Sequence, residues 1–218
     1  MANGIILYLC FLLALSFHEF AHAWVANKCG DNTAKADGRL TINPLAHIDP
    51  LGTVILPLFM ILLPLIGTGG EKLSGFIIGW AKPVPVDPSR FGKYRLQDSL
   101  VSLAGPASNF LLAFLAMLLF RFLPHGFSEA SWMGGVVNTV ALFAIINTCL
   151  AWFNLIPIPP LDGSHLLKHA VRMSEQTYYR FAQYGIWILI LALNFTPLRD
   201  ILGFCISMTV TLFERIVL

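Results

Sequence analysis

Long apolar runs constrain this chain more than any other feature of its sequence. Of its 218 residues, 56% are hydrophobic and 12% are charged, whereas about a quarter of the residues in an average soluble domain are charged. A helix needs roughly 20 apolar residues to cross a bilayer, so we expect an all-α polytopic membrane protein with about five to six transmembrane helices. The apolar stretches are Ile5–Ala26, Leu51–Ile66, Leu100–Phe122, Val136–Leu155, Phe181–Phe195 and Ile201–Leu212.

Charge and cysteine content argue against several other classes of protein. The formal net charge is only +2 and the basic residues are scattered through the loops, which disfavours nucleic-acid binding. The four cysteines form no CxxC pair, which disfavours a disulfide framework or a thiolate metal site. So many spans leave no room for a folded soluble domain. We expect one membrane-embedded domain over residues 1–218, with a catalytic core at about 5–172 and accessory helices at about 181–217.

Three ionisable side chains interrupt the first apolar run. His18-Glu19-Phe20-Ala21-His22 is an HExxH pattern, whose two histidines lie on one face of a helix and can bind one metal ion. Glu19 lies beside that face, where its carboxylate can take a proton from a metal-bound water. Ionisable residues are costly inside a bilayer and are usually functional. The pattern therefore favours a zinc site over the alternative of structural hydrogen bonds to neighbouring helices.

A third zinc ligand is expected after the fourth apolar stretch. The segment Asn154–Gly163 contains three prolines, so it cannot form a regular helix and can turn Asp162 toward the metal. As an alternative, Asp162 could cap the helix that follows. His165 and His169 are a rival ligand pair at helical spacing. No glutamate lies between them and their surroundings are polar and basic, which favours exposed histidines at the membrane interface.

The segment between the first and third spans does not have the pattern of an ordinary span. Leu51–Ile66 contains Pro57 and Pro64, and the sequence KPVPV at 82–86 favours extended backbone. The metal ligands must also share one membrane depth, which requires this segment to enter and leave on the same side. We therefore expect Leu51–Val86 to form a re-entrant or extended, β-like hairpin that lines a wet cavity.

The loop charges predict the orientation of the chain in the membrane. With the hairpin in place, one face is much richer in basic residues than the other. The rich face holds Lys28, Lys35, Arg39, Lys82, Arg90, Lys93, Arg95, Lys168, Arg172, Arg180 and Arg215, and the poor face holds Lys72, Arg121 and Arg199. The positive-inside rule makes the rich face cytoplasmic. The N-terminus is then expected outside, the C-terminus in the cytoplasm, and the metal site near the cytoplasmic boundary.

Three motifs occur in an order that resembles the site-2 protease family of intramembrane zinc metalloproteases, peptidase family M50. These are HExxH at 18–22, a GPxxN-like sequence at 105–109 and an NxxPxPxLDG-like sequence at 154–163. The resemblance, which is strongest to the compact prokaryotic branch, implies one Zn²⁺ per chain held by His18, His22 and Asp162, with Glu19 as a catalytic residue. It also implies a location in the plasma membrane. No PDZ or CBS domain, as regulated members often carry, fits in this chain.

The second and third motifs suggest further site residues. By resemblance, Asn154 is a catalytic candidate that donates to the oxyanion of the tetrahedral intermediate, although a helix-to-helix hydrogen bond explains it equally well. Asn109 could steady the substrate, but bonding between spans is the favoured alternative. Gly105 and Pro106 would allow close helix approach and a local bend.

The sequence NPLAHIDP at 43–50 recurs in compact members of the family and contributes two more candidates. His47 and Asp49 could form hydrogen bonds to the metal-binding side chains, or they could control access to the site. Turn-forming polar chemistry explains both residues equally well.

These features together predict a metalloendopeptidase that cuts membrane-spanning proteins near the cytoplasmic boundary. The expected partners are a transmembrane protein substrate, the lipid bilayer and a regulatory chain, with no nucleic acid. Residues 51–86 are the candidate for pairing with an unwound substrate by strand addition. A catalytically silent protein that binds transmembrane helices, or a metal transporter, is the alternative. A transporter is disfavoured because the ionisable residues cluster at one depth, and a silent homologue because Glu19 and all three ligands are present.

Overall fold

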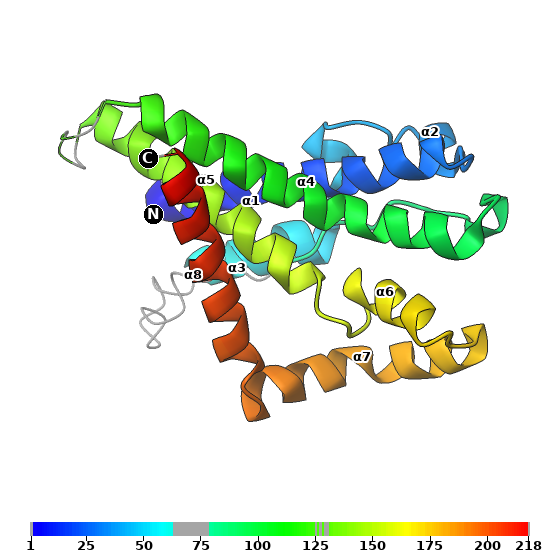
Figure 1. The fold of residues 1–218 in the computed structure, drawn as a ribbon. Coiled ribbons are helices and arrows are strands. Elements are labelled where there is room, and N and C mark those ends of the chain that lie inside the picture. Colours follow the sequence, from blue (N-terminus) through cyan, green and yellow to red (C-terminus); the bar gives the residue numbers. More distant parts are fainter. Residues whose placement is uncertain (1, 63–78, 125, 127, 129–130, 218) are drawn as a thin grey trace.

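The computed structural model is a bundle of helices (Figure 1) and describes residues 2–217 except 63–78, 125, 127 and 129–130. Within these residues no strand is formed, and the expectation of an all-α fold is confirmed. The elements are α1 (Ala2–Lys28), α2 (Thr33–Ala36), η1 (Pro44–His47), η2 (Pro50–Ile55), α3 (Leu56–Leu62), η5 (Pro88–Arg90), α4 (Tyr94–Phe122), α5 (Trp132–Asn154), α6 (Gly163–Ala170), α7 (Glu175–Phe195) and α8 (Leu198–Val217).

The long helices α1, α4 and α5 pack together and form the centre of the bundle (Figure 1). Each is long and apolar enough to cross a membrane. Small residues that are fully buried, Ala14 on α1, Ala113 on α4 and Ala151 on α5, let the helices approach closely. Close approach through small residues is typical of helices that associate within lipid.

Among the described residues, fewer helices qualify as membrane spans than the sequence suggests. The described residues contain three helices of membrane-spanning length and composition, or four if α7 and α8 cross as one bent pair, against the five or six expected. The axes of α7 and α8 differ by 80° because Thr196 adopts extended backbone immediately before Pro197. Four crossings would place both termini on one side of the membrane, whereas the sequence-based expectation has them on opposite sides.

The predicted hairpin at Leu51–Val86 is described only in part, since residues 63–78 lie outside the described chain. Its first part is helical, in η2 and α3. Its return, at residues 79–87, is extended but forms no strand among the described residues, so the β-like part of the expectation is wrong there. Pro83 and Pro85 explain this, because neither has an N–H group to give to a strand ladder.

Helix α7 supports the loop that leads from α5 to α6. Gly185 lies so close to the Pro159 carbonyl that a Cβ at position 185 would overlap it. Leu189 joins Ile156 and Leu161 of the loop in one buried cluster. Although the sequence assigns α7 to a set of accessory helices, it packs directly against the chain that carries Asp162.

Candidate metal centre

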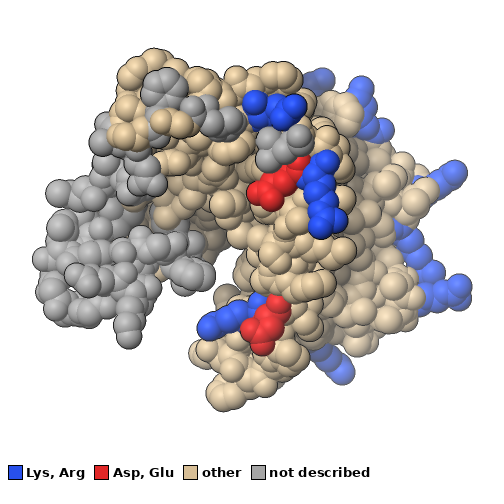
Figure 2. Space-filling model, turned by 60° about the vertical axis from the view of Figure 1, so that its left-hand side comes forward, with Lys and Arg blue, Asp and Glu red and all other residues tan. Residues whose placement is uncertain are grey.

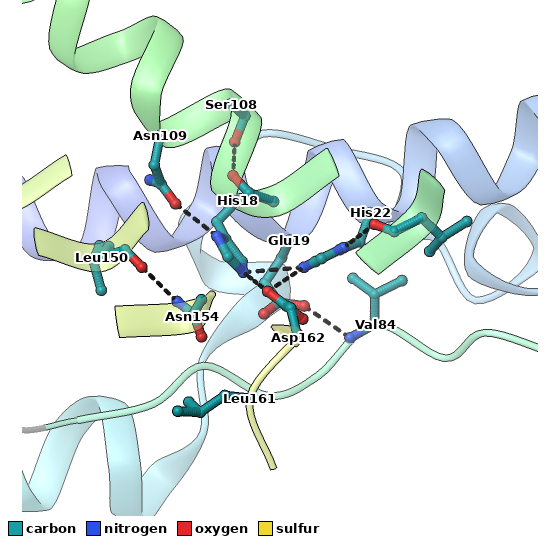
Figure 3. Close-up of polar contacts among 12 residues, drawn as sticks. His18, Glu19, His22, Val84, Ser108, Asn109, Leu150, Asn154, Leu161 and Asp162 are labelled. Atoms are coloured by element: carbon teal, nitrogen blue, oxygen red, sulfur yellow. Dashed lines mark hydrogen bonds and ion pairs between the residues drawn. The ribbon is translucent and has the colours of Figure 1, made fainter. Parts of the chain in front are cut away.

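Two elements bring His18, His22 and Asp162 to one point (Figure 3). The histidines lie one turn apart on α1, and their Nε2 atoms are 3.0 Å apart. Asp162 comes from the proline-rich loop, and its Oδ2 lies 3.1 Å from Nε2 of His18 and 3.4 Å from Nε2 of His22. In a tetrahedral zinc site with ligand bonds of about 2.0–2.1 Å, neighbouring ligand atoms lie roughly 3.3 Å apart. The three side chains therefore fit a zinc ion.

Hydrogen bonds on the far side of each ring determine which nitrogen carries the proton. His22 Nδ1 donates to the Val101 carbonyl at 2.7 Å, and a carbonyl can only accept. His18 Nδ1 donates to Oδ1 of Asn109 at 2.6 Å, while the Asn109 amide nitrogen donates to the Ala14 carbonyl at 3.2 Å. Both Nε2 atoms therefore present lone pairs, as metal-binding imidazoles do when a second group fixes the tautomer.

Asp162 contributes a third acceptor to the same point. Its Oδ2 is buried and has no hydrogen-bond donor. Three acceptor atoms held about 3 Å apart repel one another unless a cation lies between them. Asp162 occupies the cap position of α6, yet its side chain makes no capping bond, which argues against the capping alternative.

The backbone of α4 forms one wall of the metal centre at Gly105. A Cβ added at this position would lie 2.5 Å from both Cε1 and Nε2 of His18, and closer still to Nε2 of His22. A side chain at position 105 would therefore occupy the space next to the Nε2 lone pairs of His18 and His22, where a metal ion would bind. Gly105, one residue before Pro106 within α4, therefore brings the backbone of this helix close to the ligands themselves.

The two predicted catalytic residues lie beside the ligands and are not among them (Figure 3). Glu19 Oε2 accepts a hydrogen bond from the Val84 backbone N–H at 2.9 Å. Asn154 donates from its amide nitrogen to the Leu150 carbonyl of its own helix at 3.0 Å. This bond uses one of the two amide hydrogens and is not the helix-to-helix bond of the alternative interpretation.

Asn109 links the three central helices at the site. Besides accepting from His18, it donates to Oδ1 of Asn147 on α5 at 2.8 Å, and Asn147 donates to the Phe143 carbonyl. Both asparagine side chains are fully buried. This arrangement supports the favoured interpretation of Asn109 as a bond between spans and adds a direct contact with a metal ligand.

His165 and His169 bind a carboxylate and do not join the metal cluster. Asp98 of α4 accepts from Nδ1 of His165 at 3.2 Å and from Nε2 of His169 at 2.5 Å. The His169 side chain is only 9% exposed, so the expectation of exposed interfacial histidines is wrong for this residue. The cause is the buried Asp98 of α4, because its hydrogen bonds to the two histidines hold α6 against α4.

The NPLAHIDP segment forms turns. His47 is buried and its Nε2 contacts the Thr41 carbonyl at 2.8 Å. Oδ1 of Asp49 accepts from the backbone N–H groups of Leu51 and Gly52 at 3.0 and 2.7 Å. These bonds support the turn-forming alternative for both residues.

Replacing Asn109 with leucine is expected to weaken zinc binding without removing it. Leucine has the same branched shape and the same number of side-chain heavy atoms but leaves the Nδ1–H of His18 without an acceptor, and loss of such a partner typically costs about 10–100-fold in metal affinity. Zinc affinity measured by chelator competition checks this prediction. Asn194→Leu, at an exposed α7 asparagine that bonds only within its own helix, is the control. An unchanged affinity for Asn109→Leu would contradict the role given to Asn109.

Comparison with known proteins agrees with this site. A sequence model described as peptidase family M50 matches residues 125–195. YwhC of Bacillus subtilis, whose name describes a zinc metalloprotease, is 39% identical over 196 residues, which cover 88% of this chain and 81% of YwhC. Rip2 of Mycolicibacterium smegmatis, also named as a zinc metalloprotease, is 31% identical over 186 residues, and the match spans 65% of its length. No solved structure matches.

A His-His-Asp site with a neighbouring glutamate, inside a bundle of membrane-length helices, defines a membrane zinc metalloprotease. The chain belongs to peptidase family M50, the site-2 protease family.

Proposed function

We propose that the protein is an intramembrane metalloendopeptidase of the cell membrane that cuts membrane-spanning proteins near the cytoplasmic boundary. The observation that supports this most directly is the convergence of three acceptor atoms, from His18, His22 and Asp162, inside a helix bundle of membrane-span length. The N-terminus is assigned to the outside by the positive-inside rule. A silent helix-binding protein would have no use for Glu19 beside a complete ligand set.

The chemistry assigns a separate task to each residue. A zinc ion bound by the two histidines and Asp162 would supply a polarised water and a Lewis acid for the peptide carbonyl. The Glu19 carboxylate takes the proton from the attacking water and passes it to the leaving amine. The second amide hydrogen of Asn154 is available to the oxyanion once the substrate is bound.

The substrate segment must be unwound, because a helical peptide bond is enclosed by its own hydrogen-bonded turns. Extended backbone at residues 79–82 precedes the Val84 contact with Glu19 and offers a partner for an unwound substrate strand. The lipid bilayer delivers the substrate, and a separate regulatory chain can control its access.

Cleavage is expected to require the bound metal. Purified protein in detergent should cut a single-span substrate, lose at least about 100-fold of its rate after dialysis against a chelator, and regain the rate when zinc is added. Asp162→Ala should have the same effect as the chelator, whereas Asp200→Ala, at an exposed position on α8, should not. Cleavage that persists in the chelated protein would refute the proposed function. Zinc binding without cleavage of any single-span substrate would favour the silent binding protein.

A further inference from the structure

The extended segment at residues 79–87, here called the strap, reaches the proposed general base. Val84 donates its backbone N–H to Oε2 of Glu19 at 2.9 Å (Figure 3). Pro83 and Pro85 flank Val84 and have no N–H group. The amide of Val84 is therefore the single amide of the Pro83–Pro85 stretch, and it is directed at the carboxylate.

A buried arginine fixes the carbonyl that precedes this amide. Nη1 of Arg39 donates to the Pro83 carbonyl at 2.7 Å, and the Arg39 residue is only 8% exposed. In the part of the chain that the structure describes, no carboxylate lies within ion-pair distance of Arg39. Burial of a guanidinium without a carboxylate partner is costly. The burial of Arg39 is explained by a structural role: its hydrogen bond to the Pro83 carbonyl holds the peptide that joins Pro83 to Val84.

Further contacts hold the strap on both sides of Val84. The Lys82 N–H donates to the His47 carbonyl at 2.9 Å, and the Asp87 N–H donates to Oδ2 of the fully buried Asp31 at 2.7 Å. The Val84 side chain is buried in a cluster with Ala23 of α1 and Ala34 of α2. The strap therefore has little freedom to move away from Glu19.

The direction of the carboxylate matters for proton transfer. A general base works only when its oxygen lies within hydrogen-bond reach of the proton that it takes. Glu19 has several rotatable bonds and is partly exposed, so its position is not determined by packing alone. A hydrogen bond on Oε2 restricts the rotation of the carboxylate and leaves the other oxygen for the attacking water.

We propose that Arg39 is a positioning residue for the general base: it holds the Pro83–Val84 peptide, whose N–H orients Glu19. The catalytic part of this inference rests on the proposed protease function. The structural part, in which Arg39 and the strap hold Glu19, does not depend on that function, because these contacts are present without substrate. The two parts can therefore be tested by separate measurements.

The structural part is tested by hydrogen exchange at one amide. Because the Pro83–Pro85 stretch has a single N–H, deuterium uptake there reports on Val84 alone. We expect a slow exchange in the wild-type protein and an exchange about tenfold faster in Glu19→Ala, which removes the charged acceptor. Arg39→Met should have a similar effect, and Arg39→Lys, which keeps a donor for the Pro83 carbonyl, should restore most of the protection. Fast exchange of Val84 in the wild-type protein would overturn the inference even if no Arg39 variant folds.

The catalytic part is tested by kinetics on a single-span substrate. Arg39→Met should lower kcat about tenfold, with KM within about twofold and with zinc content and thermal midpoint equal to those of the wild type. Lys35→Met, an exposed basic residue on α2 that is close in sequence, is the matched control and should cleave normally. An unchanged kcat in Arg39→Met, or a loss of activity that only follows a loss of zinc or of thermal stability, would overturn the positioning role. If the wild type itself does not cleave, the proposed function fails, while the exchange measurement still decides whether the strap holds Glu19.

Discussion

Replacing Glu19 with glutamine is expected to abolish cleavage of a single-span substrate while one zinc ion per chain remains bound. Glutamine keeps the size of the side chain and an oxygen that can accept from the Val84 N–H. It cannot accept a proton from the attacking water at neutral pH. Loss of a general base typically costs about 10²–10⁴-fold, so we expect a rate roughly 10³-fold below that of the wild type.

Two measurements on the same purified sample check this result: the initial rate of substrate cleavage and the zinc content by elemental analysis. Glu214→Gln, an exposed glutamate on α8, is the control for the same chemical change and should cleave at the wild-type rate. Activity of Glu19→Gln near the wild-type rate would show that Glu19 is not the base. Loss of zinc from this variant would show instead that Glu19 belongs to the ligand set.

The metal ligands could be predicted from the sequence because their signals are local. The spacing of His18 and His22 places both rings on one face of α1 for any regular helix. Asp162 follows a run of prolines that excludes a helix, so its side chain is free to turn away from the axis. The distances in the structure meet both expectations, with the three ligand atoms 3.0–3.4 Å apart.

The partners of the ligands could not be predicted in the same way. His22 donates to the carbonyl of Val101, and a backbone carbonyl has no sequence signature. His18 and Asn109 are 91 residues apart, so their contact depends on how α1 packs against α4. The same holds for Asp98 and His169, which are 71 residues apart. A polar residue within an apolar run signals only that some partner exists.

The number of spans illustrates a further limit of sequence patterns. Apolar composition identifies α7 and α8 as hydrophobic helices, and the break between them falls at Thr196 and Pro197. Composition cannot give the angle at the break, which is 80° and allows the pair to count as at most one span. That angle depends on the extended backbone of Thr196 and on the packing of α7 against the loop near Pro159.

Replacing Gly105 with alanine is expected to empty the metal centre without destabilising helix α4. Alanine favours helix over glycine by about 0.5–1 kcal/mol, so the backbone itself should tolerate the change. The added methyl group would lie 2.5 Å from Nε2 of His18 and closer to Nε2 of His22, in the space beside both lone pairs. Relief of this overlap requires the histidines to move apart, which destroys the geometry that a zinc ion needs.

We expect zinc content below about a tenth of an equivalent and a cleavage rate reduced by about 10²-fold or more, because the protein retains neither the polarised water nor the Lewis acid. Gly135→Ala is the matched control. A Cβ at that position on α5 would meet no atom of another element within 4 Å, so this variant should keep its zinc content. Full zinc occupancy in Gly105→Ala would mean that α1 and α4 can separate at the site without loss of the metal. In that case the ligand geometry would be determined by the loop that carries Asp162, and the close approach at Gly105 would contribute only to helix packing.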